Sequence, residues 1–367
     1  MKLNRVLNER LLPLIFFNSL FLSAFSYADD YPVQPYFIAD SFSYSETVSI
    51  ESTLHGWEGD NFESGEQQWT WNWFELGVQY QHWAVGIVQR YDYALQFSPE
   101  TADFFWLVAN KKDLPVGKQY DLNLQVNALH SSGVRVSYAN SLTNTFNYRV
   151  GLTYLQANYM INGQIKGNAT AVGNSDYDYQ AALDYAYTTD DIFDRVVDEP
   201  TGKGFALDLE FSYQITPSTH WQFQVRDLFA KLYWKNSPYT EGNSTSERKE
   251  YDENGYVSIN PILTGYEGTR DVYVQKLQPR WYSKVSHQLT SHYTAVLQYR
   301  YQYDRALFSL GGNYKLGNNN RLGVNYWPIN QAAEINWNYH KIQLAVVTDA
   351  LRSSAVKTFG LSFSYGL

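Results

Sequence analysis

The sequence predicts an all-β fold, a transmembrane antiparallel up-and-down β-barrel, from three observations. Tyr, Trp and Phe make up 17 % of the 367 residues, whereas charged residues make up only 18 %. Apolar side chains recur at every second position in several segments, which is the pattern of strands with one apolar face. The N-terminus carries the features of an export signal. An exported chain with such strands fits a barrel that turns its apolar side to lipid and its polar side to an enclosed lumen.

The composition excludes several other classes of protein. Mean hydropathy is −0.43, and no apolar run of roughly 20 residues follows the signal, which excludes a bundle of membrane-spanning helices. So many aromatic side chains bury more surface than a disordered chain contains. The chain has no cysteine, which removes disulfide scaffolds, thiolate metal sites and thiol catalysis.

The first 28 residues, 1–28, read as a secretory signal peptide. Three basic residues precede an apolar run over 11–25, and small residues follow at two positions of 26–28 that a signal peptidase reads. We expect 29–367 to form a single outer-membrane barrel domain. Cleavage removes three basic residues and one acidic residue, which changes the formal net charge from −9 to −11. So acidic a chain is unsuited to neutralising phosphates, and nucleic acid is not an expected partner.

Strict alternation of side chains identifies the strands. In 83–97 the odd positions are large and mostly apolar, whereas the even positions are small or charged. The same alternation recurs in 120–128, in 205–213 and at the end of the chain in 359–367. Near Asp227 the apolar positions switch from odd to even, which predicts a β-bulge. A soluble β-sandwich is the alternative fold, but it should show more apolar inward runs.

The mature chain resembles a Gram-negative outer-membrane β-barrel protein. The final strand, Phe359 to Leu367, is similar to the signal through which that class contacts the barrel-assembly machinery, although Leu367 stands where Phe is usual. The resemblance implies an outer-membrane location and outer-membrane lipid as a partner. The stretch 202–209 resembles a strand opening in barrels related to fatty-acid porins and in conjugation-associated barrels. No Asn-Pro-Ala hatch occurs near the mature N-terminus, so transport of hydrophobic substrates does not carry over.

The number of strands follows from the even parity of such barrels and from the placing of long loops on the outer side. Counting the alternating segments predicts about 16 strands, with 14 as the next alternative. One short loop helix is expected near 99–112, because Ser98 suits the N-cap position and Pro99 the first turn. That helix either packs as part of a loop or narrows the mouth of the barrel.

Charged residues on the non-lipid faces of the strands are the candidate functional residues. Opposite charges on facing walls of a lumen would favour small polar or zwitterionic solutes. Alternatively, the charges pair across strands and fill a closed interior. The residues expected to line the lumen are Arg90, Asp92, Asp208, Glu210, Arg226, Arg300, Arg321 and Glu334.

One pair of residues allows a catalytic hypothesis. His130 and Ser132 share one face of a strand, as in the outer-membrane phospholipase A and lipid A deacylase families, which the His-x-Ser fragment resembles. Asn140 or Asn144 would then orient the imidazole. Against this, 131–133 reads as a hairpin turn on the periplasmic side. The sequence contains no cofactor motif, and its acidic loops are either solvated or candidate Ca²⁺ ligands.

We therefore predict a passive, porin-like channel for small solutes that is not an enzyme. One alternative is a closed barrel that serves as a structural or accessory component of an envelope export or assembly system. The other alternative is a lipid hydrolase that uses His130 and Ser132. Patterning begins close to Tyr36, which leaves no room for the N-terminal plug domain of an energised receptor.

Overall fold

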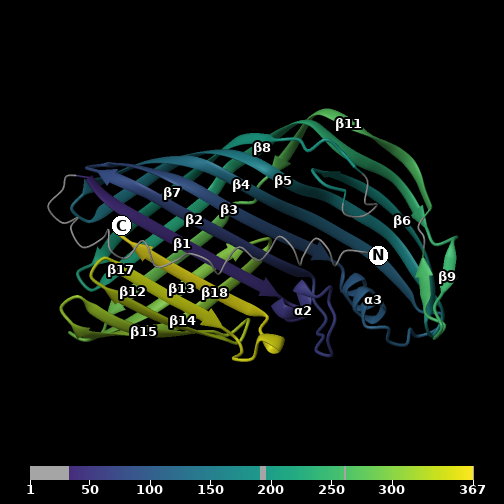
Figure 1. Cartoon of the computed structure of the whole chain (residues 1–367). Coiled ribbons are helices and arrows are strands. Elements are labelled where there is room, and N and C mark those ends of the chain that lie inside the picture. The colour runs from purple at the N-terminus through teal and green to yellow at the C-terminus, as the bar shows by residue number, and fades with distance from the viewer. Residues whose placement is uncertain (1–32, 191–195, 260–261, 367) are drawn as a thin grey trace.

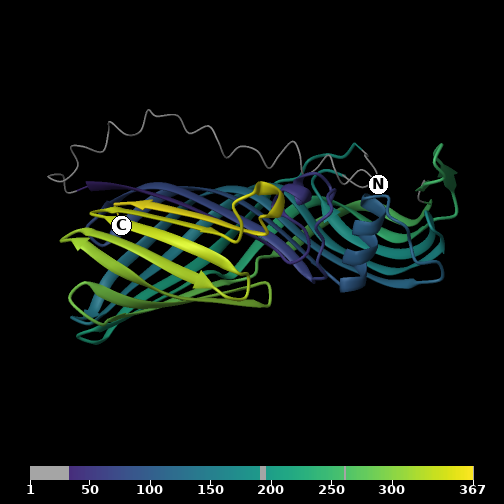
Figure 2. The same cartoon turned by 90° about the horizontal axis from the view of Figure 1, so that it is seen from below.

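The computed structural model describes residues 33–190, 196–259 and 262–366. The predicted signal peptide and its cleavage site lie outside these residues. The described chain forms a closed antiparallel barrel whose strands run obliquely around its axis (Figure 1, Figure 2). The ring closes because β1 (Val33–Ser45) pairs with β2 (Gln67–Tyr80) on one edge and with β18 (Thr358–Tyr365) on the other.

The barrel ring has 14 strands, so the prediction of about 16 is not confirmed and the alternative of 14 is observed. One sheet holds 16 strands in the described residues, but four of them occupy only two places in the ring, two strands to each place. β6 (Asp176–Tyr187) and β7 (Gly202–Thr216) lie end to end between β5 and β8. β11 (Ile262–Lys276) and β12 (Arg280–Gln288) lie end to end along the other edge of β8. The remaining strands are β3 (Trp83–Phe97), β4 (Gln119–Thr143), β5 (Phe146–Gly173), β8 (Thr219–Thr245), β13 (Tyr293–Gln302), β14 (Arg305–Gly317), β15 (Asn320–Trp327), β16 (Ala332–Tyr339) and β17 (Ile342–Thr348), with β9 (Lys249–Tyr251) and β10 (Val257–Ile259) forming a separate hairpin.

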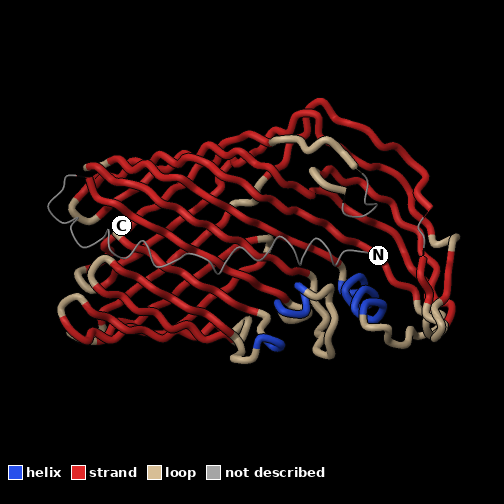
Figure 3. The backbone as a smooth tube through the Cα atoms, viewed as in Figure 1, coloured by secondary structure: helices blue, strands red, loops and turns tan. Residues whose placement is uncertain are grey.

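The two sides of the barrel differ greatly in height. β4, β5 and β8 contain 25, 28 and 27 residues, whereas β12 to β18 contain between 7 and 13. A tilted strand of about ten residues is enough to cross a bilayer. The tall side therefore continues well beyond one end of the ring, and Figure 3 shows this continuation as uninterrupted strand. We call β6, β11 and the adjoining parts of β4, β5 and β8 the extension.

In the ring, apolar side chains point outward. Exposed Val, Leu, Ile and aromatic side chains occur on strands all around it, and most of them alternate with inward-facing polar or small residues. The alternation predicted for 83–97 follows this rule, since Ile87 is 69 % exposed and its neighbour Val88 is fully buried. This apolar belt is represented by Leu76, Val85, Ile87, Val136, Leu152, Phe205, Leu297, Leu310, Val324, Ile335 and Phe359.

On β5 and β8 the inner face becomes apolar in the extension. Leu232 and Trp234 of β8 are fully buried, whereas Tyr233 between them and Lys231 and Lys235 beside them are exposed. The buried side chains form a hydrophobic core shared by β4 to β8. The predicted bulge near Asp227 is confirmed, because Asp227 has a φ of 62° and the register of β7 with β8 shifts on both sides of Leu207. The bulge stands where the ring passes into the extension.

The predicted loop helix is confirmed as α3 (Pro99–Ala109). The Ser98 hydroxyl accepts a hydrogen bond from the Thr101 amide at 3.2 Å and donates one to the carbonyl of Asp121 at 2.8 Å. The Thr101 hydroxyl accepts from the amide of Asn123 at 2.8 Å. Because β3 ends before this part of β4, the helix satisfies an edge that has no strand beside it. The other helices are α2 (Ile50–Leu54) and the 3₁₀ turn η2 (Ser353–Ala355).

None of the helices in the described ranges has the length and apolar character needed to cross a bilayer.

At the far end of the extension, a cation fastens the β9–β10 hairpin to β6. Lys249 Nζ lies 2.7 Å from carboxylate oxygens of both Asp176 and Asp178. The hydrogen bond from Lys249 holds the pKa of Asp178 below its usual value. The Tyr251 hydroxyl donates to Asp176 at 3.0 Å.

Candidate functional site

Three cavities follow the axis of the barrel. The central cavity has a volume of about 480 Å³. The turn-side cavity, of about 520 Å³, lies at the end where short hairpin turns such as Gln81-His82 join the strands. The extension cavity, of about 290 Å³, lies at the base of the extension. The first two share lining residues such as Arg149 and Tyr282, whereas the central and extension cavities share none.

A buried ionic cluster lies between the central and extension cavities, and we call it the septum. It consists of Arg90, Asp92, Asp227 and Arg280, whose side chains are between 0 and 7 % exposed. Arg90 pairs with Asp92 and places its two terminal nitrogens 2.5 and 2.8 Å from the carboxylate of Asp227. Arg280 lies 2.8 Å from the same carboxylate. Two cations and two anions thus balance one another away from the surface.

A second ionic network lies on the turn side of the septum. Arg135 Nε donates to Asp208 at 3.0 Å, and its Nη1 lies 3.4 Å from Glu75. Glu210 is 3.7 Å from both Arg135 and Arg149. Asp208 also accepts a hydrogen bond at 3.2 Å from the backbone amide of Asp227, where the bulge turns that amide inward. The bulge therefore links the two clusters.

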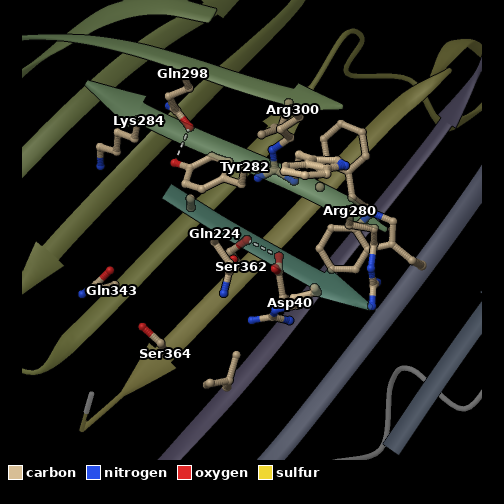
Figure 4. Close-up of a pocket in the computed structure, with 18 of the residues that line it drawn as sticks. Asp40, Gln224, Arg280, Tyr282, Lys284, Gln298, Arg300, Gln343, Ser362 and Ser364 are labelled. Carbon is tan, nitrogen blue, oxygen red and sulfur yellow. Dashed lines mark hydrogen bonds between the residues drawn. The ribbon is translucent and has the colours of Figure 1, made fainter. Parts of the chain in front are cut away.

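Polar and cationic side chains cover one continuous wall of the central cavity. The register places the inward residues of β8, β12 and β13 in three rows. Each of the nine residues lines the central cavity, and none is a carboxylate. Figure 4 labels most of this cationic wall together with Asp40, Gln343, Ser362 and Ser364, which come from other strands. The rows are Arg226, Arg280 and Gln302; then Gln224, Tyr282 and Arg300; then Gln222, Lys284 and Gln298.

Two arginines of the cationic wall rest on aromatic rings instead of pairing with carboxylates. The guanidinium of Arg226 lies 4.9 Å from the ring centre of Trp73. That of Arg300 lies 4.8 Å from Phe42 and 5.4 Å from Tyr282. Among the residues that the structure describes, no ion pair within 4 Å joins either arginine to an acid. Stacking of this kind holds a guanidinium in place and leaves its edge free to donate hydrogen bonds.

The structure distributes the eight predicted lumen residues over these features. Arg90 and Asp92 belong to the septum, and Asp208 and Glu210 to the second network. Arg226 and Arg300 belong to the cationic wall. Two further residues lie on the short side of the ring. Glu334 lines the central cavity and accepts hydrogen bonds from Gln298, Asn325 and Trp327 at 2.8 to 3.1 Å, whereas Arg321 is exposed and lines none of the three cavities.

Sequence reasoning missed several residues of the site. Glu75 and Arg135 stand at inward positions of regular strands, so the alternation alone contained the signal for them. Arg280 opens a strand directly after Pro279, and Asp227 lies inside the bulge. Alternation is interrupted at both places, so no period-two pattern could place those two side chains inward.

The structure gives the catalytic hypothesis no group to orient the imidazole. The expected hairpin turn at 131–133 is wrong, because these residues lie in the middle of β4, as His130 and Ser132 both do. His130 stacks on Tyr159 with ring centres 4.6 Å apart and meets Tyr91 edge-on at 4.8 Å. Asn140 lies ten residues along the same strand, about 34 Å away at the rise of a β-strand. It cannot orient the imidazole, and in the described part of the chain no three His, Asp or Glu side chains gather to hold a metal ion.

The helix α3 packs outside the lumen. Its Ala102 and Phe105 join a hydrophobic cluster with Leu95, Phe97 and Trp57. No residue of 98–118 lines any of the three cavities. Of the two interpretations of this loop, the packed helix is the one observed.

No protein-family model and no curated protein sequence matches the chain. Solved structures with a similar fold include the TodX monoaromatic hydrocarbon channel in a ΔS2S3 mutant form, with 10 % identity, coverage of 91 % of this chain and 90 % of that one, and a TM-score of 0.43. The Pseudomonas putida toluene transporter TodX follows with 9 % identity, coverage of 91 and 90 %, and a TM-score of 0.40. The β domain of the Bordetella autotransporter BrkA has 13 % identity, coverage of 91 and 100 %, and a TM-score of 0.31.

Proposed function

We propose that the protein is a passive outer-membrane channel for small polar solutes. The observation that carries this proposal is the junction of the central and turn-side cavities, which share the charged and amide side chains Arg149, Glu210, Gln222 and Gln224. Hydrated solutes need such a lining, because an apolar one would strip their water without replacing its hydrogen bonds.

The apolar belt supports the location in a membrane. A soluble barrel would expose so many large apolar side chains at a high free-energy cost, whereas lipid accommodates them. In bacterial barrels the short turns face the periplasm and the longer connections face outward. By that rule the turn-side cavity opens to the periplasm, and the extension stands outside the cell.

The septum acts as the gate in this proposal. A solute that passes from the extension cavity to the central cavity must move past Arg90, Asp92, Asp227 and Arg280, which are buried in one another. Breaking one partner of a buried pair is costly, while removing both partners of a pair leaves no unpaired charge. The gate should therefore open wider when Arg90 and Asp227 are replaced together.

Planar-bilayer recording of the purified protein tests the channel. We expect conductance steps from the natural protein and larger steps from the double variant Arg90→Ala with Asp227→Ala. Gln89→Ala, an exposed position next to Arg90 on β3, is the matched control and should conduct like the natural protein. If neither the natural protein nor the double variant conducts, although both migrate as folded barrels on unheated gels, the channel is excluded.

A second candidate is a structural or accessory barrel of an envelope assembly, and one observation favours it. In the described residues β11 pairs with β8 on one edge and has no strand on the other. An open strand edge is a template for pairing with another chain. Affinity isolation of the protein from its native membranes separates the two functions, because an accessory barrel would retain a stoichiometric partner and a simple channel would not.

A further inference from the structure

The charged residues that line the central cavity are not evenly mixed. The cationic wall contains cations and no carboxylate. Four of its nine residues are cations, namely Arg226, Arg280, Lys284 and Arg300. The others are four glutamines and Tyr282. The carboxylates that line the same cavity, Asp40, Glu210 and Glu334, come from other strands. Positive charge is thus concentrated on three consecutive strands.

Two of these cations stand directly opposite each other. Arg226 of β8 is the register partner of Arg280 of β12. Like charges at facing positions of neighbouring strands destabilise a sheet. The charge of Arg280 is offset by Asp227 at 2.8 Å, but that of Arg226 has no acid within 4 Å among the described residues. An anion in the cavity would remove the repulsion.

The two stacked arginines are prepared to bind such an anion. Arg226 Nη1 and Arg300 Nε are buried, and neither has a hydrogen-bond partner in the parts of the chain that the structure describes. Buried donors are normally satisfied, so these two guanidiniums retain donor capacity that no described acceptor uses. Each guanidinium stacks on an aromatic ring that fixes its plane. The ring is Trp73 for Arg226 and Phe42 for Arg300. A fixed guanidinium edge matches the two oxygens of a carboxylate.

The surroundings favour an organic anion over a bare inorganic one. The half-buried Tyr282 offers ring surface and the half-buried Leu344 offers aliphatic surface within the same cavity, whereas Phe42 is only 1 % exposed. On β17 and β18, Gln343, Ser362 and Ser364 are uncharged, and Ser362 donates a hydrogen bond at 2.6 Å to the one carboxylate beside them, Asp40 of β1. An inorganic oxyanion would leave the ring surface unused, whereas the body of an organic acid would cover it.

We propose that the cationic wall binds the carboxylate group of a small organic acid, with Arg226 and Arg300 as the donors and Lys284 as the nearby counter-charge. The inference deepens the proposed channel function, since it names the solute class that the central cavity selects. The concentration of cations also makes the open channel anion-selective.

Calorimetric titration of the detergent-solubilised full chain tests binding without requiring conductance. The probes are sodium benzoate, the uncharged analogue benzyl alcohol and sodium phosphate. We expect saturable binding of benzoate, weaker binding of phosphate and none of benzyl alcohol. Arg226→Gln and Arg300→Gln should each raise the Kd for benzoate at least tenfold, the equivalent of about 1.4 kcal/mol. Lys231→Gln, an exposed cation on the outer face of β8, is the matched control and should change nothing.

A second variant keeps the test valid if the arginine variants fail to fold. Gln222→Glu adds a negative charge next to Lys284 and leaves every stacked arginine in place. It should weaken benzoate binding and shift the reversal potential in a salt gradient toward cations. Equal binding of benzoate and benzyl alcohol, or tighter binding of phosphate than of benzoate, would overturn the carboxylate assignment. A protein that binds benzoate yet never conducts would retain this site and lose the channel function, so the two failures are distinguishable.

Discussion

The ring and the extension use the same alternating strand pattern, but along β5 the apolar face changes sides between them. On β5, the outward residues Leu152 and Tyr154 of the ring are apolar, and the next outward residue, Gln156, is polar and exposed. On the inward side, Thr153 is followed by Leu155 and then by apolar residues of the extension core. β5 thus passes from lipid into water, and its apolar residues change from the outward to the inward face at that boundary. The comparison teaches that the reversal point marks the edge of the membrane better than strand length does.

The largest effect is expected in the core of the extension. Trp234→Ala should lower the free energy of unfolding of the extension by about 3 to 5 kcal/mol, the cost of removing a buried aromatic side chain. The ring should remain folded, because its stability depends on lipid contact and its own ladder of hydrogen bonds. Limited proteolysis of the protein in detergent, followed by gel mobility of the ring, measures the two parts separately. Tyr233→Ala, at the exposed neighbouring position, is the control. Simultaneous loss of ring and extension would show that they are one cooperative unit.

The boundary on β5 can be tested with one substitution at two positions. Leu152→Arg places a charge in the apolar belt and should cost about 2 to 4 kcal/mol, as charges do near the middle of a bilayer. Gln156→Arg, four residues along the same face, should change stability by less than about 0.5 kcal/mol, as surface substitutions do. Unfolding in urea from lipid vesicles provides both values. Equal costs at the two positions would remove the assignment of the membrane edge.

The edge that α3 protects should respond more weakly. Ser98→Ala removes the N-cap of α3 and its hydrogen bond to Asp121. Loss of such a cap typically costs about 1 kcal/mol. Hydrogen exchange should accelerate in α3 and in β4 near Asn123, and should stay unchanged in the ring strands. Uniform protection in the variant would mean that the hydrophobic cluster alone holds the helix.

The smallest effect concerns pH at the tip of the extension. The pKa of Asp178 is lowered by its hydrogen bond from Lys249. The stabilisation is therefore complete above the pKa of a free carboxyl, about 3.9, and is lost as the pH falls through the lowered pKa of the folded state. Proteolytic opening of the β9–β10 hairpin should rise only in that acidic range. Asp178→Asn should abolish much of this pH dependence, and a step at neutral pH would point to a different group.

The fold was predictable from the sequence where alternation runs unbroken. The segment 83–97 and the final strand show period two throughout, and the structure has β3 and β18 there. The helix α3 was predictable from Ser98 and Pro99, because caps are local. The strand number was not, since β6 and β11 alternate like the ring strands and only their pairing shows that they share places with β7 and β12. Pairing is a long-range property that local patterns do not encode.

The candidate site divides in the same way. Arg90 and Asp92 follow from the alternation of one strand. The cationic wall does not, because Arg226, Lys284 and Arg300 lie on three strands whose register must be known before the residues form rows. Asp227 lies in the bulge, where the pattern that would place it is interrupted. The sequence thus predicts which face of its own strand a residue occupies, but not which residues of other strands lie beside it.

The unequal height of the two sides makes the barrel asymmetric in the plane of the membrane. A barrel whose strands all end at the same height presents a similar rim on every side. Here β4, β5 and β8 rise beside one half of the mouth, while the turns that follow β13 and β15 end low on the other half. A solute that approaches the mouth from the end with the extension is therefore shielded on one side and unobstructed on the other. A neighbouring membrane protein likewise meets a different surface on each side of the barrel.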